Sequence, residues 1–149
     1  ISIKDLGFRM ALLQIIYTSH AAVQLDSRSL RTMVAGASRK NRTLGITGLL
    51  YCANDSYLQV LEGDEKAVLL LYADILRDSR HDDIQTVVIR PIEQADFSNW
   101  SMGLLEAVEE PIDLTEVLSR KDDRVGVWND AKWQSIVNTF RAELETMPP

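Results

Sequence analysis

The chain has 149 residues, 46% of them hydrophobic and 26% charged, and carries a net charge of −6 at neutral pH. That length suits one domain with its own core, no apolar run approaches the roughly 20 residues that span a membrane, and the acidic balance argues against nucleic-acid binding. Cys52 is the only cysteine and the two histidines lie far apart. This excludes a disulfide framework and a Cys/His zinc site, and it predicts a cytoplasmic protein without a metal.

The first predicted element is a strand at residues 12–19, LLQIIYTS. Because side chains alternate between the two faces of a strand, Leu13, Ile15 and Tyr17 share one face. Tyr17 therefore ends an apolar stripe, and its hydroxyl needs a hydrogen-bond partner. A core tyrosine whose hydroxyl reaches the surface would satisfy the same pattern.

A helix is predicted from Asp26 or Ser27, either of which can cap it, to about Lys40. Asn41 continues the apolar stripe of this helix just past its expected end, where asparagine is common as a C-cap. The residues around it form a basic cluster: Arg39, Lys40 and Arg42. Such a cluster either complements the helix dipole in solvent or binds phosphate.

Residues 45–63, GITGLLYCANDSYLQVLEG, are predicted to form a β-hairpin with its turn at 54–56. In the second strand Gln59 shares a face with Tyr57 and Leu61. The other face carries Leu58, Val60 and Glu62. A buried amide must satisfy its donors and acceptors. A backbone carbonyl, a water, or a ligand with hydrogen-bonding edges would each serve.

A second helix is predicted after Gly63 and Asp64, and a charge-dense loop at 77–83 follows it. The buried face of the helix comprises Val68, Leu71, Tyr72 and Ile75. His81 has no second histidine or cysteine nearby, so a surface or anion-contact role is favoured over a metal role.

A fourth strand is predicted at 84–92, stopping near Pro91, and a fifth at Leu104 and Leu105. Trp100 and Met102, which lead into the fifth strand, are two residues apart and are therefore expected on one face. Core packing would explain both side chains.

These elements predict an α+β, ferredoxin-like fold with a mixed five-stranded sheet in the order βαββαββ. Right-handed crossovers place the two helices on one face of the sheet. Tyr17 and Gln59 are then expected to point into the same layer, between sheet and helices.

The C-terminal part is predicted to be helical and to cover the other face of the sheet, although a partner subunit is an alternative occupant of its apolar stripe. Asp113 is expected to cap a short helix, and Asn129 or Asp130 to begin a longer one. Its stripe comprises Trp133, Ile136 or Val137, Phe140 and Leu144. We expect residues 1–9 to be a non-native or disordered start, 10–108 the main domain, and 109–149 a helical cap or output segment.

No glycine-rich phosphate loop, HExxH, GxSxG or defensible pair of acid/base carboxylates is present, so the residues do not indicate an enzyme. Five motifs occur in order: IIYTS, the asparagine before GITGLL, LQVLEG, DSRH and FSNWSMG. Together, over roughly 12–105, they resemble the BLUF family, the bacterial blue-light sensors that use FAD. The resemblance implies a short single-domain member whose domain at 10–108 holds the flavin ring between the two helices.

The resemblance also implies roles for individual residues around the flavin ring. Tyr17 matches the photoactive tyrosine of the family, and Gln59 matches the glutamine that links this tyrosine to the flavin. Asn41 matches the asparagine that hydrogen-bonds the ring carbonyls. Trp100 and Met102 match a tryptophan and a methionine that act in signal relay.

For the cofactor phosphates, the resemblance points to Arg80 and His81, preceded by Asp78 as in relatives. Asp74 departs from the pattern, because several relatives carry a basic residue there. This departure shifts the expected phosphate contacts to Lys40 or Arg80.

The function implied is that of a non-enzymatic, homo-oligomeric blue-light receptor with non-covalently bound FAD. Light-driven electron and proton transfer around Tyr17, Gln59 and the flavin would rearrange hydrogen bonds, and the signal would pass to a separate effector protein. Two other readings stay open at this point: a flavin-dependent oxidoreductase, and a flavin-free ferredoxin-like regulatory module.

Overall fold

The computed structural model describes residues 11–53, 55–107, 118–119 and 127–146. Its main sheet contains five strands: β1 (Leu12–Ala21), β2 (Thr47–Ala53), β3 (Ser56–Asp64), β4 (His81–Ile92) and β5 (Gly103–Ala107). The helices are α1 (Ser27–Leu44), α2 (Glu65–Leu76) and α3 (Asp130–Glu145). A two-stranded piece, β6 (Leu118–Ser119) with β7 (Val127–Trp128), was not expected from the sequence.

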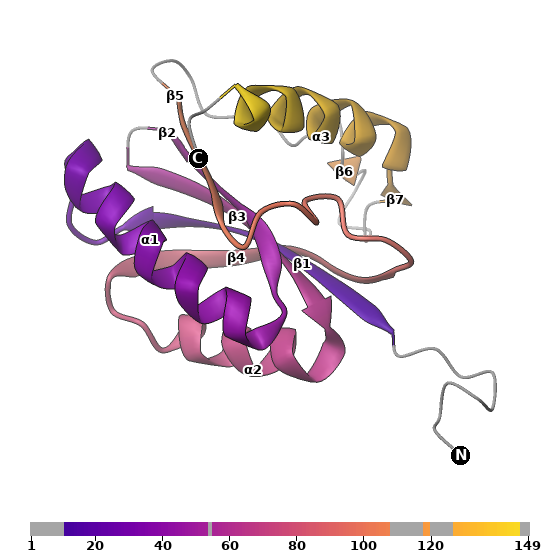
Figure 1. The fold of residues 1–149 in the computed structure, drawn as a ribbon, viewed down its shortest axis with the longest axis horizontal. Coiled ribbons are helices and arrows are strands. Elements are labelled where there is room, and N and C mark those ends of the chain that lie inside the picture. The colour runs from indigo at the N-terminus through magenta and orange to yellow at the C-terminus, as the bar shows by residue number, and fades with distance from the viewer. Residues whose placement is uncertain (1–10, 54, 108–117, 120–126, 147–149) are drawn as a thin grey trace.

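The strand order in the sheet is β4-β1-β3-β2-β5. β3 is antiparallel to β1 and β2, β4 is antiparallel to β1, and β5 is parallel to β2. Each helical crossover links two strands of like direction, with a third strand between them. Helices α1 and α2 lie on one face of the sheet and α3 lies on the other (Figure 1). The predicted ferredoxin-like α+β fold with a mixed sheet is therefore confirmed.

Helix α1 begins as predicted but ends later. The Asp26 side chain accepts a hydrogen bond from the Ser29 amide at 2.7 Å, which is an N-cap. The helix continues past Lys40 to Leu44, because the left-handed conformation that closes it falls on Gly45, at φ 67°. The predicted helix end near Lys40 was therefore wrong, and Asn41 lies in the last turns of the helix, which excludes the alternative that it is the C-cap.

Two apolar layers cover the two faces of the sheet. Between the sheet and α1/α2 lie side chains such as Ile15, Tyr17 and Leu61. Between the sheet and α3 lie Ile16, Leu49, Val60 and their neighbours, together with the α3 stripe of Trp133, Val137, Phe140 and Leu144. The Asn129 side chain caps α3, so the predicted helix and its covering position are confirmed. The predicted cap at Asp113 and the start at 1–9 lie outside the described residues.

The fourth strand is longer than predicted. It begins at His81 rather than at residue 84, and it runs through Pro91, which pairs with Leu13. A proline is tolerated there because β4 is an edge strand, so that its missing N–H group removes no ladder hydrogen bond on the outer side.

Trp100 and Met102 lie on opposite sides of the sheet, contrary to the prediction. β5 begins only at Gly103, and both residues precede it in irregular chain, where the alternation rule for strands does not apply. Met102 is buried in the layer with α1 and α2, whereas Trp100 packs against the layer beneath α3.

Candidate functional site

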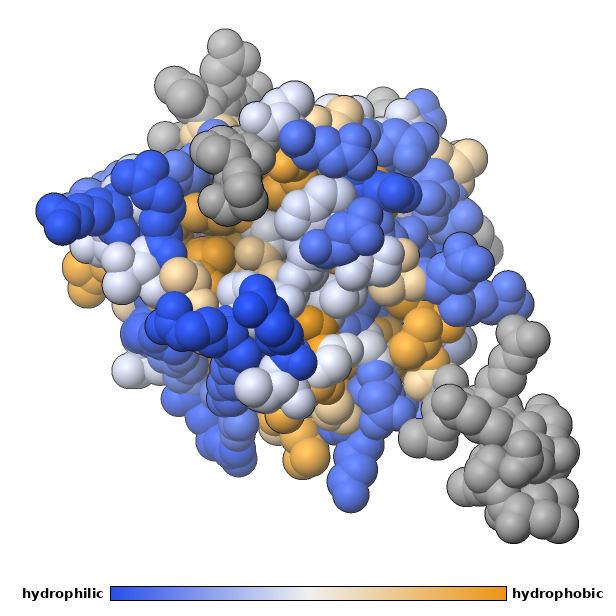
Figure 2. Space-filling model, viewed as in Figure 1, coloured by the Kyte–Doolittle hydropathy of each residue, from blue (hydrophilic) through white to orange (hydrophobic). Residues whose placement is uncertain are grey.

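A cavity of about 700 Å³ lies between α1, α2 and the sheet. Its sheet side is formed by Tyr17, Leu50 and Gln59, which come from β1, β2 and β3. Apolar side chains of the two helices also line it, among them Val34 and Leu71. Hydrophilic side chains cover the outer side of α1, and apolar side chains are visible beside it (Figure 2). Apolar walls with a few polar groups are typical of a small-molecule site.

Tyr17 and Gln59 are direct partners in the β1–β3 register, and both side chains line the cavity. The prediction that they point into the same layer is confirmed. Antiparallel pairing brings such cross-strand neighbours about 5 Å apart at their Cβ atoms. A phenol and a primary amide therefore lie side by side at the floor of the cavity.

The Tyr17 phenol is held in its protonated form. Its side chain is 2% exposed, and its ring lies 5.3 Å from that of Tyr72 and 6.2 Å from that of His81. Burial, with smaller contributions from Tyr72 and Asp78, raises the pKa of Tyr17 far above its usual range. Its hydroxyl makes no hydrogen bond to a described residue, so it is available to a ligand.

Two amide side chains present hydrogen-bonding groups to the cavity. Gln59 donates from Nε2 to the Met102 sulfur at 3.6 Å, which is a weak acceptor. Asn41 donates from Nδ2 to the Ser101 carbonyl at 2.9 Å and is 2% exposed. Together with Tyr17 they suit a flat heteroaromatic ring whose edges carry both donors and acceptors. Trp100, the other expected relay residue, does not line this cavity.

The charged residues expected near a phosphate also line the cavity. They are Lys40, Asp74, Asp78, Arg80 and His81. Arg80 is already engaged by Asp78, to which its Nε donates at 2.9 Å, and these hydrogen bonds lower the pKa of Asp78 to about 2. Lys40 has no ion-pair partner among the described residues, which leaves its charge available to an anion.

Asp74 and His81 are both occupied by neighbours. The Asp74 carboxylate forms an ion pair with Arg77 at 2.8 Å, so its charge at the cavity edge is balanced. His81 Nε2 donates to the Ile75 carbonyl at 2.9 Å, and Nδ1 lies 3.2 Å from the Ser19 hydroxyl. Both ring nitrogens thus tie β4 to α2 and β1, and the phosphate role of His81 stays a prediction.

The sequence reasoning missed a polar network on the opposite face of the sheet. Gln14 and Glu62 are fully buried there, and Asp96 and Arg90 join them. Strand alternation placed Glu62 on a face with Leu58 and Val60, but no buried polar partners were predicted for its carboxylate. A glutamate on the same face as two apolar residues in an alternating strand was the available signal, because a buried carboxylate requires partners.

In the part of the chain that the structure describes, no group of His, Cys, Asp and Glu side chains is arranged to hold a metal ion. No described helix has both the length and the apolar composition needed to cross a membrane.

Residues 12–103 match the sequence profile of the BLUF family, described as sensors of blue-light using FAD. Among curated proteins, the photoactivated adenylate cyclase subunit beta of Euglena longa is 35% identical over 109 residues, which cover 70% of this chain and 12% of that protein. The blue light- and temperature-regulated antirepressor BluF of Escherichia coli is 34% identical over 92 residues, 62% of this chain and 23% of that protein. The chain therefore spans only a small part of either relative.

Solved structures agree with the sequence matches. The dark state of the BLUF protein BlrB superposes with a TM-score of 0.60 at 31% identity, covering 66% of this chain and 75% of that one. The photo-activated state of BlsA gives 0.60 at 28% identity, covering 65% and 71%. The family's domain is a sensory module rather than a catalytic one. This chain belongs to the BLUF family, and its residues 12–103 form a flavin-binding blue-light sensor domain.

Proposed function

We propose that this chain is a blue-light receptor that binds FAD non-covalently in the cavity between α1 and α2 and signals to another protein. The observation that carries the proposal is the pairing of Tyr17 with Gln59 across β1 and β3, both facing the cavity. Membership of a family of blue-light sensors that use FAD supports the choice of cofactor.

The described side chains fit the parts of that cofactor. Asn41 and Gln59 supply amide groups for the edges of the flavin ring, and the apolar walls suit its faces. Lys40, whose charge is unpaired within the described chain, and Arg80, which Asp78 orients, would hold the phosphates. Guanidinium and ammonium groups are the usual partners of phosphate in proteins.

When bound, the flavin would supply light absorption and an oxidising excited state. Tyr17 is the source of the electron and of the proton, which its raised pKa keeps on the hydroxyl in darkness. Gln59, its neighbour in the register, relays the proton. After the electron and the proton have returned to Tyr17, Gln59 would be left rotated or tautomerised. Because the two ends of an amide are nearly isosteric, this change alters the Gln59 contact with Met102 at little steric cost. Met102 and Trp100 then carry the change toward the C-terminal part.

The output belongs to the same proposal. The relatives named as a photoactivated cyclase and as an antirepressor suggest an effector in cyclic-nucleotide turnover or in transcription. We propose a bacterial, cytoplasmic receptor that forms homo-oligomers and contacts its effector through the C-terminal segment at 109–149, with the sensor domain at 10–108.

The first test is an absorption spectrum of the purified protein in darkness and again just after blue light. We expect a flavin band that moves slightly to the red and relaxes in darkness. Gln59→Leu should abolish the shift, because it removes the relaying amide, while Gln85→Leu on the exposed side of β4 should preserve it. Chromatography of the heat-released cofactor separates FAD from FMN.

Two outcomes would overturn the proposal. An oxidised flavin spectrum indifferent to light, with steady NADH oxidation, would support the oxidoreductase. A colourless protein that does not take up added FAD would support the flavin-free module.

A further inference from the structure

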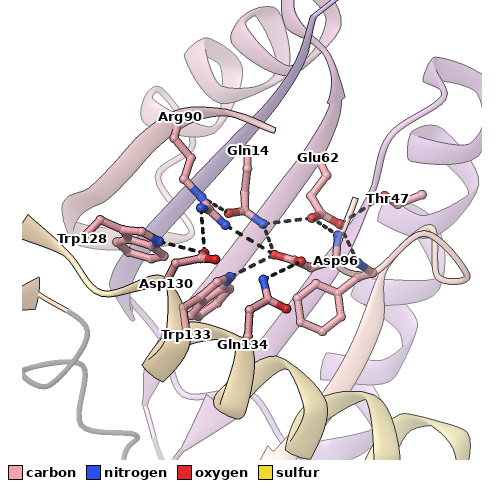
Figure 3. A network of polar contacts seen from close by, with 10 residues as sticks. Gln14, Thr47, Glu62, Arg90, Asp96, Trp128, Asp130, Trp133 and Gln134 are labelled. Atoms are coloured by element: carbon pink, nitrogen blue, oxygen red, sulfur yellow. Dashed lines mark hydrogen bonds and ion pairs between the residues drawn. The ribbon is translucent and has the colours of Figure 1, made fainter. Parts of the chain in front are cut away.

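The polar network beneath α3 is built around a second polar pair in the same two strands. Gln14 and Glu62 are partners in the β1–β3 register, three residues along each strand from Tyr17 and Gln59. Because three is odd, the two pairs lie on opposite faces of the sheet. Gln14 and Glu62 are both 0% exposed, and Gln14 Nε2 donates to Glu62 Oε2 at 2.9 Å (Figure 3).

Glu62 fixes the start of the β4–β5 connection, by which we mean residues 93–102. Its Oε2 accepts the Asp96 amide at 2.6 Å, and its Oε1 accepts the Phe97 amide at 2.9 Å. Its other partners among the described residues, Gln14 and Thr47, are also donors. A carboxylate suits this position because all of its neighbours donate.

The far end of the β4–β5 connection is held by the cavity side of the protein. The Trp100 carbonyl accepts from the Gly48 amide at 2.9 Å, the Ser101 carbonyl accepts from Asn41, and the Met102 sulfur accepts from Gln59. The connection therefore passes from one face of the sheet to the other, fixed by side chains of both layers.

Asp96, at the start of this connection, also holds α3. Its Oδ2 accepts the Trp133 indole N–H at 2.9 Å, and its Oδ1 accepts the Gln134 amide at 3.2 Å (Figure 3). Trp133 is 0% exposed. Hydrogen bonds to an ionised carboxylate are stronger than neutral ones and are screened little in a buried place.

The Arg90 guanidinium contacts residues of both the sheet and α3. Arg90 on β4 donates from Nε to Gln14 Oε1 at 2.7 Å, lies 3.6 Å from Asp96, and contacts Asp130 of α3 at 3.1 Å. The first turns of α3 are thus attached to β4 and to the β4–β5 connection by charged groups as well as by apolar packing.

We propose that Glu62 and Asp96 are positioning residues that couple the β4–β5 connection to α3, so that a displacement of Met102 in light changes how α3 docks on the sheet. The Glu62 carboxylate binds two adjacent backbone amides, and the Asp96 carboxylate binds the Trp133 indole. These hydrogen bonds restrict independent movement of the β4–β5 connection and α3. The trigger rests on the proposed light reaction, whereas the coupling between Glu62 and α3 also exists in darkness.

The first experiment tests the response to light. It measures hydrogen exchange of the α3 amides in the full flavin-loaded chain, in darkness and under illumination. In the wild-type protein illumination should accelerate exchange in α3. Trp133→Phe removes the indole donor, so we expect dark exchange to rise about tenfold and the light-minus-dark difference to disappear. The red shift in absorption should persist, because Tyr17 and Gln59 are untouched.

Two control variants separate coupling from packing. Val137→Ala opens a gap beneath α3 at a fully buried position without touching Asp96, so dark exchange should rise while the light-minus-dark difference remains. Asp130→Asn removes the charge that pairs with Arg90 but no contact with the β4–β5 connection, and it should keep the difference.

A second experiment, which needs no light, uses Glu62→Gln to test the coupling between the β4–β5 connection and α3. Glu62 makes no hydrogen bond to a described residue of α3. Its replacement should nevertheless accelerate exchange in α3 in darkness, through the loosened connection. Unchanged exchange in α3 would overturn the coupling, whether or not the protein responds to light.

The remaining outcomes are also decisive. A Trp133→Phe protein with a wild-type light-minus-dark difference would refute the relay, and so would a Val137→Ala protein that loses the difference as completely as Trp133→Phe. A wild-type protein without any light-induced absorption shift would refute the proposed function instead, and the Glu62→Gln experiment would then decide the coupling alone.

Discussion

Tyr17 has a buried ring and a hydroxyl that faces the cavity. Burial raises its pKa above the ordinary value of 10.0, so the phenol keeps its proton at pH values where an exposed tyrosine ionises. A hydroxyl that is protonated, oriented by the sheet and free of a described hydrogen-bond partner is suited to donate to a bound ring.

The Tyr17 hydroxyl should be required for the light response but not for flavin binding. Tyr17→Phe keeps the ring and its packing, so flavin uptake should be retained while the light-induced shift falls to the baseline. Tyr72→Phe is the matched control, because the Tyr72 hydroxyl bonds to Thr86 Oγ1 at 2.6 Å and not to the cavity side. Difference spectra of the two variants check the expectation, and a full shift in Tyr17→Phe would contradict it.

A second residue-scale prediction follows from Glu62. Burial raises the pKa of its carboxyl above 4.5, although the amides of Phe97 and Asp96 act against the rise. The folded protein then binds this proton more tightly than the unfolded chain. The stability that Glu62 contributes is fully present below its unfolded pKa and is lost as pH rises through the raised pKa.

Urea unfolding of the wild type and of Glu62→Gln, from about pH 4 to about pH 8, measures this effect. The free energy of unfolding of the wild type, relative to the variant, should decrease as pH rises. A difference that stays flat, or that increases with pH, would show that the native pKa of Glu62 is not raised.

Among the elements, two glycines of the sheet lie against close neighbours: Gly48 of β2 and Gly103 of β5. A Cβ built on Gly48 would lie 1.9 Å from the Val60 carbonyl oxygen, which belongs to the paired backbone of β3. A Cβ on Gly103 would meet the Leu144 side chain of α3 at 2.8 Å. Backbone in the middle of a sheet cannot yield, whereas a leucine side chain can change rotamer.

Alanine substitutions should therefore differ in cost. We expect Gly48→Ala to lower the free energy of unfolding by about 4 kcal/mol and Gly103→Ala by about 1–2 kcal/mol. Denaturant titrations of both variants provide the comparison. Equal costs would mean that Leu144 is held as firmly as the β2–β3 ladder.

The β4–β5 connection shows how an element outside regular structure sets the site. Its chain is not extended, so Met102 turns to the cavity and Trp100 to the α3 side. Period-two alternation is a property of strands. Applied to this irregular segment, it wrongly placed both side chains on one face.

For the whole molecule, the two faces of the sheet are covered differently. The α1/α2 face contains the cavity, while the α3 face is packed by a helix whose stripe includes Phe140, 3% exposed and with its ring 5.1 Å from Tyr51. The two faces thus have different roles, ligand binding on one and structural cover on the other, and the β4–β5 connection joins them.

Truncating Phe140 tests this division of roles. Phe140→Ala should cost about 3–5 kcal/mol and lower the melting temperature by roughly 10 °C, while flavin uptake in the cold is retained. Leu70→Ala, at a position 60% exposed on α2, should change stability by less than about 0.5 kcal/mol. Loss of flavin binding in folded Phe140→Ala protein would show that the cavity also requires the apolar packing beneath α3.

Local patterns in the sequence were sufficient for much of this structure. The alternation of Leu13, Ile15 and Tyr17 placed the tyrosine on the correct face, and the spacing of Trp133, Phe140 and Leu144 identified the buried side of α3. Such rules succeed because the geometry of a strand or helix repeats within a few residues.

Which of these residues contact one another is known only from the tertiary structure. The partnership of Tyr17 with Gln59, the separation of Trp100 from Met102, and the network that joins Glu62 to Asp96 and Trp133 all depend on register and on contacts between distant segments. Patterns within single elements were enough to predict the fold class and to identify the motifs and the residue types available for the site. Their arrangement followed from long-range pairing, because no periodicity within one element specifies which residue of another element it will face.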